Sequence, residues 1–285
     1  MSTKHNIAFF GTPDRAVWTL DILHASGFTP AVIITQPDKP QGRKLVLTPP
    51  PAKVWAQEHN IPVLQPQKLD EGFSAELLKY EIELSVVIAY GKIIPKSILD
   101  IPKHGTLNIH GSLLPKYRGA SPIESAILND DKDTGVSIIL MDEQMDHGPI
   151  IAEEKVSNVN WPPTADELAR EIVSTGAKRL VSIIPDWILG KITPKTQEHD
   201  QATFTKKISK EDGHIDLQDD PYKNILKIQA YQGWPGTFFF SAKNNTNTRI
   251  KITQARFENS KLIIEKVIPE GKKEMSYEEF TKNLN

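Results

Sequence analysis

Short, nearly uninterrupted runs of apolar residues recur along the first half of this chain and restrict the folds that it can adopt. Residues 7–10, 31–34, 84–89 and 135–141 form such runs, and they are rich in Val and Ile. Runs this short and this apolar are typical of strands that are buried on both faces, as in a parallel sheet. Helical patterns separate them, as over residues 16–26. The alternation predicts an α/β fold with a Rossmann-like, mostly parallel sheet.

The length of the chain and its later part predict two domains. A single hydrophobic core usually stops growing at about 250 residues, and this chain has 285. We expect the first domain to span residues 1–190, and the polar residues 191–204, which lack a period, to form the linker. Residues 205–285 contain several short strand patterns, so they predict a small β-rich domain.

Composition narrows the class of protein further. The chain has no cysteine, which excludes disulfides, thiol nucleophiles and cysteine-based metal sites. The formal net charge is -2 and the excess of basic residues after residue 190 is small, so charge alone gives no argument for nucleic acid. A strand pattern starts almost at once and no apolar run could span a membrane, so we expect a cytoplasmic protein without a membrane partner. We also expect a monomer.

Chemically capable side chains cluster between residues 106 and 149. Residues 107–110 alternate between apolar and polar, so Asn108 and His110 project from the same face of a predicted strand. Gly111 then ends the strand and begins a turn. An amide donor and an imidazole therefore point into one space beside a loop, where functional sites commonly lie.

A carboxylate follows the next predicted strand. Residues 135–141 form that strand, and Asp146 lies in the polar loop after it. If this strand and residues 107–110 are neighbours in a parallel sheet, Asp146 and His110 lie together beyond the carboxyl edge of the sheet, where open α/β folds bind ligands. A carboxylate beside a histidine orients the imidazole and favours its charged form.

The same cluster has three other interpretations. The asparagine and histidine of the strand could be no more than hydrogen-bonded residues of the core. His104, His110 and His147 suggest a metal ion, but they lack the spacing of a helical histidine pair or of H-E-x-x-H, and we expect no metal. Ser112 with His110 and Asp146 has the composition of a hydrolase triad, yet no G-x-S-x-G elbow surrounds Ser112.

The residues of this cluster resemble the folate-dependent formyltransferases. The resemblance rests on Asn108-x-His110, on the motif S-L-L-P-x-Y-x-G that begins at Ser112, and on Asp146 in a D-x-G context. It implies transfer of a formyl group from 10-formyltetrahydrofolate to an amine without a metal, with Asn108, His110 and Asp146 as the catalytic residues. It also implies donor-binding residues in two turns: Ser112, Leu113, Leu114, Pro115, Tyr90, Gly91 and Ile94.

These residue types suit the reaction that the resemblance implies. The transfer passes through a tetrahedral intermediate with a negatively charged oxygen. We expect Asn108 and a protonated His110 to stabilise this oxyanion. We expect Asp146 to orient His110 and to relay the proton of the amine, directly or through water.

Within this family, the resemblance is strongest to the members that act on tRNA. Residues 35–53 contain TQPDKP-x-GR and LTPPP-x-K, which are similar to a loop that contacts the acceptor arm in those members. The segments ISKEDG-x-ID, WPGTF and PEGKK-x-M resemble their C-terminal domain of oligonucleotide-binding (OB) barrel type. The implied partner is initiator methionyl-tRNA, and the implied contacts are Lys39, Arg43, Lys44, Lys206, Lys207 and Lys210. As a plain set of charges, the same side chains are typical of solvated surface.

Two departures from the family pattern affect the C-terminal domain. The segment between Arg249 and Leu262 is shorter than usual, so we expect a shortened barrel that lacks one hairpin. Gln229 stands where an arginine is common, which removes one charge from a surface expected to meet RNA. A nucleotide-sugar N-formyltransferase is the alternative enzyme, and a nucleic-acid-binding module on an inactive scaffold is the alternative outside the enzymes.

Overall fold

The fold comes from a computed structural model, which describes residues 5–42, 45–157, 159–243 and 246–282. The chain divides into two compact units. The first unit contains residues 1–118, 134–157 and 169–204. The second unit contains residues 119–133, 158–168 and 205–285. Two earlier segments therefore pack with the C-terminal part of the chain, and the domain boundaries suggested by the sequence stay a prediction.

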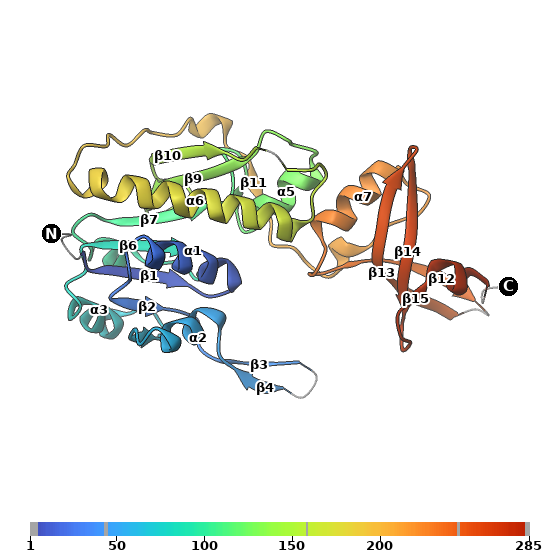
Figure 1. The fold of residues 1–285 in the computed structure, drawn as a ribbon, viewed down its shortest axis with the longest axis horizontal. Coiled ribbons are helices and arrows are strands. Elements are labelled where there is room, and N and C mark those ends of the chain that lie inside the picture. The colour runs from blue at the N-terminus through green and yellow to red at the C-terminus, as the bar shows by residue number, and fades with distance from the viewer. Residues whose placement is uncertain (1–4, 43–44, 158, 244–245, 283–285) are drawn as a thin grey trace. The chain divides into compact units, whose positions relative to one another are not determined.

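The first unit is built on a seven-stranded sheet (Figure 1), with the strand order β10-β9-β7-β6-β1-β2-β5. The strands are β1 (Ile7–Gly11), β2 (Val32–Ile34), β5 (Val63–Leu64), β6 (Leu84–Ile88), β7 (Thr106–His110), β9 (Gly135–Leu140) and β10 (Ile150–Lys155). Five neighbouring strands, in the spatial order β7, β6, β1, β2 and β5, pair in parallel. In contrast, β9 pairs antiparallel with both β7 and β10. The predicted mostly parallel α/β fold is therefore confirmed.

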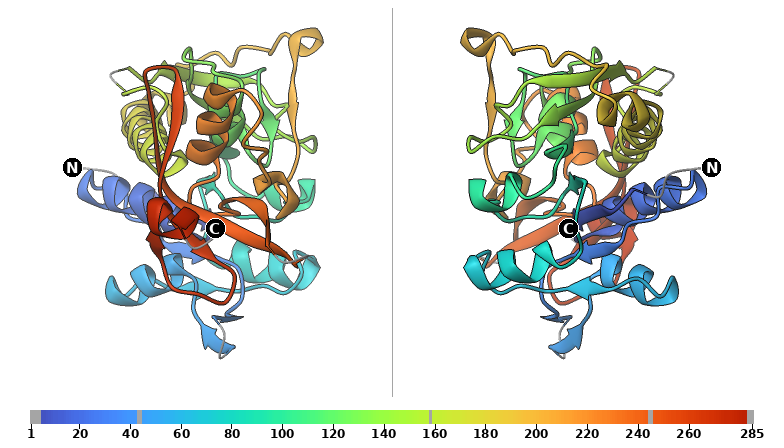
Figure 2. Two further views of the ribbon diagram at one scale, coloured as in Figure 1. Left: turned by 90° about the vertical axis from the view of Figure 1, so that its right-hand side faces the viewer. Right: turned by 90° about the vertical axis from the view of Figure 1, so that its left-hand side faces the viewer.

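Helices cover both faces of this sheet. They are α1 (Asp14–Ala25), α2 (Pro51–Glu58), α3 (Glu71–Leu78), α4 (Lys96–Leu99) and α6 (Ala165–Ile188). Figure 2 shows α1 and α6 on one side of the sheet and α3 on the other. On the α3 side, Phe10 of β1 lies in one buried cluster with Phe73 of α3 and Ile98 of α4. Burial of such side chains stabilises the fold by about 1.5–3 kcal/mol each.

The packing of α6 covers one side of β7 and leaves the other side available for a functional site. A Cβ atom on Gly176 would lie 2.7 Å from Val136 Cγ2 and 2.8 Å from Ile109 Cγ2, so the helix backbone approaches these two strands very closely. Ile109 therefore faces α6. Because side chains alternate along a strand, the residues on either side of Ile109 face away from this helix.

Local signals explain where several helices begin. Asp70 caps α3 by accepting a hydrogen bond from Phe73 N at 3.2 Å, and Pro51 starts α2 at a position where its missing N–H is no loss. Pro185 lies inside α6, and the helix continues past it to Ile188. Across the described ranges, no helix is both long enough and apolar enough to cross a membrane.

The proline-rich segment after β2 contains a hairpin that the sequence did not predict. Its strands are β3 (Lys39–Gln41) and β4 (Val46–Thr48), which pair antiparallel and form a separate two-stranded sheet. Pro40 lies opposite Leu47 in this hairpin. A proline is tolerated here because the two-stranded hairpin has only edge strands.

The second unit contains an antiparallel sheet with the order β12-β13-β14-β15. Its strands are β12 (Thr237–Lys243), β13 (Thr246–Glu258), β14 (Lys261–Pro269) and β15 (Met275–Ser276), and its helices are α5 (Pro122–Leu128), α7 (Pro221–Ala230) and α8 (Tyr277–Lys282). The remaining elements are the short strands β8 (Arg118–Gly119) and β11 (Phe204–Thr205), which pair, and two 3-10 turns, His199–Gln201 and Glu211–Gly213.

A separate core holds this second sheet. Ile225 of α7, Phe239 of β12, Ile250 of β13 and Val267 of β14 are buried together. The β-rich C-terminal part of the chain is therefore confirmed. Within the described residues the sheet ends at β12 on one side and at β15 on the other, and the expected shortening of a barrel stays a prediction.

One ion pair in the second unit gives its stability a pH dependence. Lys206 Nζ lies 2.6 Å from Asp212 Oδ1, and Ser209 N donates to Asp212 Oδ2 at 2.7 Å. These hydrogen bonds, from Lys206 first and then from the Ser209 backbone, lower the pKa of Asp212 to about 2. Because the folded state favours the charged carboxylate, this contact stabilises the unit above the ordinary pKa of 3.8 and loses its effect as pH falls from there to about 2.

We predict that Asp212→Asn lowers the melting temperature at neutral pH and that the difference from wild type vanishes as pH falls from about 4 to about 2. Thermal unfolding followed by circular dichroism over this range measures the effect. Asp219→Asn, which changes an exposed carboxylate of the same unit, is the matched control. An equal difference at neutral and at acid pH would contradict the assigned cause.

Candidate functional site

β7 carries the asparagine and the histidine of the candidate site. Since Ile109 faces α6, Asn108 and His110 project from the opposite face of the sheet, as the alternating sequence predicted. Asn108 is half-buried, and the side chain of His110 is only 5% exposed. Both groups therefore have positions fixed by a central strand, with water largely excluded from the imidazole.

Asp146 adjoins both of these side chains. Its Oδ1 atom lies 3.5 Å from Asn108 Nδ2 and 3.4 Å from His110 Nδ1. Its side chain is 14% exposed, so the three groups meet where solvent is scarce. The structure thus brings together the three residues that the sequence suggested as catalytic, and their catalytic roles stay a prediction.

Asp146 reaches this position by a different route from the one expected. β9 pairs antiparallel with β7, with Leu140 opposite Leu107, so the end of β9 lies beside the start of β7. A residue directly after β9 would lie at the wrong edge of the sheet. Residues 141–149 instead fold back and bring Asp146 to the second half of β7. The expected parallel pairing was wrong because the apolar pattern of a strand does not encode its direction.

The fold-back depends on two unusual backbone positions. Asp146 has a φ of 49°, in the left-handed region that Asp adopts more readily than most residues. A Cβ atom on Gly148 would lie 1.8 Å from the carbonyl oxygen of Leu140. Only glycine allows the loop to lie this close to the end of β9.

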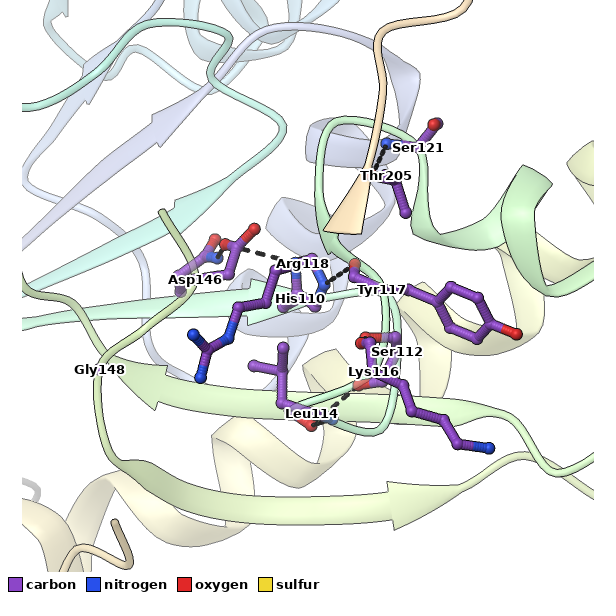
Figure 3. A network of polar contacts seen from close by, with 12 residues as sticks. His110, Ser112, Leu114, Lys116, Tyr117, Arg118, Ser121, Asp146, Gly148 and Thr205 are labelled. Carbon is purple, nitrogen blue, oxygen red and sulfur yellow. Dashed lines mark hydrogen bonds and ion pairs between the residues drawn. The ribbon is translucent and has the colours of Figure 1, made fainter. Parts of the chain in front are cut away.

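Both ring nitrogens of His110 face oxygen acceptors. Nε2 lies 3.0 Å from the carbonyl oxygen of Tyr117, and Nδ1 faces the Asp146 carboxylate on the other side (Figure 3). A neutral imidazole has only one N–H, whereas an imidazolium donates from both nitrogens and satisfies both contacts. Tyr117 has a φ of 60°, a conformation that is rare for a bulky residue and that the surrounding turn must hold.

The turn after β7 is held by its own hydrogen bonds. The Ser112 hydroxyl is buried and donates to the carbonyl of Lys116 at 2.6 Å, rather than to His110. The geometry of a hydrolase triad is therefore not formed. Leu114 is also buried, and its backbone N–H donates to Ser137 Oγ at 2.9 Å. Figure 3 shows this turn beside the imidazole.

The other residues expected to bind a donor fall into two groups. Leu113 and Pro115 are half-buried and Gly91 is exposed, so each presents surface to a ligand. Tyr90 and Ile94 have side chains buried in the core on the α3 side of the sheet, and burial raises the pKa of Tyr90 to about 12. These two residues can meet a ligand only through their backbone.

The residues expected to contact tRNA are partly described. Exposed side chains belong to Lys39 on β3 and to Lys206, Lys207 and Lys210 in the second unit. Lys206 is engaged by Asp212. Arg43 and Lys44 lie outside the described residues.

Sequence reasoning missed a buried polar group next to the Asp146 loop. Arg118 is 3% exposed and Gln197 is 5% exposed, and the guanidinium donates to the Gln197 amide oxygen. Arg118 Nη2 also lies 2.8 Å from His199 Nδ1, so that nitrogen accepts. Desolvation, with the charges of His147 and Arg118, lowers the pKa of His199. No sequence pattern separates a buried glutamine from the polar residues around it.

The histidines considered as metal ligands have other contacts. His147 Nδ1 lies 2.6 Å from Asp142 Oδ2, and the His147 ring stacks on that of His199 with centroids 4.0 Å apart. Within the part of the chain that the structure describes, no group of three or more His, Asp or Glu side chains is arranged to hold a metal ion.

Comparison with known families matches both parts of the chain. A family model described as formyl transferase matches residues 5–184. A model described as the formyl transferase C-terminal domain matches residues 207–262. The first match contains β1 to β10 and therefore Asn108, His110 and Asp146.

Individual relatives give the same result. The methionyl-tRNA formyltransferase of Chloroflexus aurantiacus is 44% identical over 237 residues, which are 82% of this chain and 76% of that protein. The solved methionyl-tRNA formyltransferase from Clostridium thermocellum has a TM-score of 0.62 at 21% identity and covers 93% of this chain and 98% of its own. An N-formyltransferase from Helicobacter canadensis, solved with folinic acid and dTDP-3-aminofucose, has a TM-score of 0.65 at 20% identity, with coverage of 90% and 88%. At such identities the solved structures support the fold alone.

The contact at Gly148 gives a test of the folded-back loop. We predict that Gly148→Ala destabilises the protein by about 1–3 kcal/mol, because the added methyl group collides with backbone that cannot move aside cheaply. Urea unfolding measures this change. Gly72→Ala, at a helical position where the nearest atom to an added Cβ is Asp70 Oδ1 at 3.4 Å, is the control and should keep or raise stability. Equal stability of the two variants would contradict the packing described.

Proposed function

The chain belongs to the formyl transferase family, and we propose that it transfers the formyl group of 10-formyltetrahydrofolate to the amino group of initiator methionyl-tRNA. The observation that carries this proposal is the meeting of Asn108, His110 and Asp146 at one point of the sheet. An amide donor, a charged donor and a carboxylate are the groups that this chemistry requires. Translation initiation is the process that the product would serve.

The reaction forms one C–N bond and breaks another. The amino nitrogen attacks the formyl carbon and gives a tetrahedral intermediate with a negatively charged oxygen. Collapse of the intermediate breaks the bond to N10 of the folate, which takes up a proton, while the attacking amine loses one. Catalysis therefore needs stabilisation of the oxyanion and an acceptor for the amine proton.

We assign the stabilisation of the oxyanion to Asn108 and His110. The Asn108 Nδ2 atom lies 3.5 Å from Asp146 Oδ1, a distance that is too long for a strong hydrogen bond, so Nδ2 can turn to a stronger acceptor at little cost. His110 contributes positive charge in a buried position, where charge acts over a low dielectric. Its Nε2 faces Tyr117 and its Nδ1 faces Asp146, so His110 would act on the oxyanion through its charge, while Asn108 would supply the direct hydrogen bond.

We assign two functions to Asp146. Its carboxylate orients the His110 ring through Nδ1. The same carboxylate accepts the proton that the amine loses, directly or through a water molecule. Both functions require the Asp146 side chain to stay at its observed place beside β7.

We assign donor binding to the two turns that flank these groups. Leu113 and Pro115 offer half-buried apolar surface to the folate ring, and Ser112 and Leu114 hold the turn through the hydrogen bonds described above. In the turn that follows β6, Tyr90, Gly91 and Ile94 would contribute through their backbone. The protein would act as a monomer.

For the acceptor, the sequence relatives favour methionyl-tRNA. The relative from Chloroflexus aurantiacus is a methionyl-tRNA formyltransferase at 44% identity, and its match covers most of both chains. The exposed lysines of the β3–β4 hairpin and of the second unit can meet phosphates. An N-formyltransferase that acts on an amino-sugar nucleotide is the second candidate, since the fold of the Helicobacter canadensis enzyme is similar.

An acceptor assay tests the proposal. The purified chain is incubated with 10-formyltetrahydrofolate and with methionyl-tRNA, free methionine or an amino-sugar nucleotide, and consumption of the donor is measured. We expect the donor to be consumed when methionyl-tRNA is the acceptor, and not with free methionine or the amino-sugar nucleotide. The KM for tRNA should rise steeply with salt, because binding to phosphates releases counterions. Consumption with the sugar nucleotide supports the second candidate, and tRNA binding without any consumption supports an inactive binding module.

The roles of the site residues predict the effect of their removal. Asn108→Ala loses an oxyanion donor, which typically costs about 2.7–4 kcal/mol, so kcat should fall by about 10²–10³ while the melting temperature changes little. Asp146→Ala should lower kcat at least as much. Asn129→Ala and Asp100→Ala, exposed positions elsewhere in the chain, are the controls. Near wild-type kcat in either site variant would refute the assigned roles.

A further inference from the structure

A buried glutamine lies behind the loop that carries Asp146. Gln197 comes from the polar segment expected to be a linker, and its neighbours Thr196 and Glu198 are exposed. Its own side chain is nevertheless 5% exposed. Burial of an amide is costly unless its donors and acceptors are paired, so its contacts must explain its position.

Both ends of the Gln197 amide are paired. Nε2 donates to the carbonyl oxygen of Asp146 at 2.9 Å and to that of Gly148 at 2.7 Å. Oε1 accepts from Arg118 Nε at 3.2 Å and from Nη2 at 2.6 Å. Carbonyls only accept and a guanidinium only donates, so the orientation of the amide is determined by its partners.

Arg118 gives this amide a rigid support. The guanidinium is 3% exposed, and Nη2 also donates to His199 Nδ1 at 2.8 Å. Its backbone N–H donates to the carbonyl of Thr203 at 2.9 Å. Arg118 is therefore fixed at both backbone and side chain, and Gln197 transmits that rigidity to the loop.

The loop needs such support because its own tip is open to solvent. Residues 143–145 are exposed, and Asp146 itself has a left-handed backbone. The two carbonyls that Gln197 holds are those of Asp146 and Gly148, the residues on either side of His147, so one of them belongs to Asp146 itself. Misplacement of a catalytic group by about 1 Å can cost on the order of 10²-fold in rate.

We propose that Gln197 is a positioning residue, which holds the Asp146 carboxylate beside His110 by clamping the backbone carbonyls of Asp146 and Gly148 to the buried Arg118. The kinetic test of this inference rests on the proposed function. The hydrogen bonds of Gln197 to the loop can also be tested without any substrate.

Gln197→Glu is the informative variant. A carboxylate has nearly the same shape and still accepts from Arg118, so the buried guanidinium keeps its partner and the protein should fold. A carboxylate cannot donate, however, and would face the carbonyl oxygens of Asp146 and Gly148 with a repulsive charge. The substitution therefore releases the loop and leaves the rest of the network in place.

Asn6→Asp is the matched control. The Asn6 amide also donates to two backbone carbonyls, those of Tyr80 at 3.3 Å and of Glu81 at 3.4 Å. It lies just before β1, at the amino end of the parallel strands and away from the site. The same change from amide to carboxylate therefore removes a similar clamp without touching the Asp146 loop.

The first readout is hydrogen–deuterium exchange of the substrate-free protein. Peptides that cover residues 141–149 should exchange at least tenfold faster in Gln197→Glu than in wild type, and at the wild-type rate in Asn6→Asp. Unchanged exchange of this loop in Gln197→Glu would overturn the clamp. This result holds whatever the acceptor of the enzyme is.

The second readout is a kinetic double-mutant cycle with methionyl-tRNA. Gln197→Glu alone should lower kcat by about 10- to 100-fold with the KM for the folate donor changed less than twofold. In an Asp146→Asn background, measured under single-turnover conditions, the same substitution should lower the rate less than threefold, since the group that it positions is already lost. An equal loss in both backgrounds would overturn the positioning role. Absence of any wild-type turnover would instead refute the proposed function and leave the exchange experiment to decide on the clamp.

Discussion

The close contact between Gly148 and the Leu140 carbonyl is the constraint on which the site depends. Because β9 is antiparallel to β7, the chain leaves β9 at the edge of the sheet remote from His110. Only a loop that doubles back tightly returns a carboxylate to that histidine, and only glycine permits the contact at the bend. The arrangement of Asn108, His110 and Asp146 is thus set by the packing of a loop as much as by the strand order.

Buried polar groups hold this arrangement in place. The guanidinium of Arg118 and the amide of Gln197 satisfy one another, and the ring nitrogens of His110 both face acceptors. In a low-dielectric interior such networks are strong when complete and costly when broken. Groups that are oriented before the substrate arrives need no rearrangement as charge develops, which is the main source of electrostatic catalysis.

Local patterns predicted much of the first unit. The period-two alternation around Ile109 placed Asn108 and His110 on one face, and the apolar runs predicted the buried strands that the structure contains. The hairpin around Pro40 was missed because its strands are short, exposed and interrupted by proline. Gln197 was assigned to a linker because a polar residue carries no signal of burial.

The sequence by itself determined the alternating α/β elements, the β-rich C-terminal part, and a family resemblance that the comparisons confirm. Tertiary structure alone decided that β9 runs antiparallel, that residues 141–149 fold back, and that Gln197 and Arg118 meet behind Asp146. The reason is physical. Periodicity reports which face of an element is apolar, whereas strand direction and the pairing of buried polar groups depend on contacts between residues that are far apart in the chain.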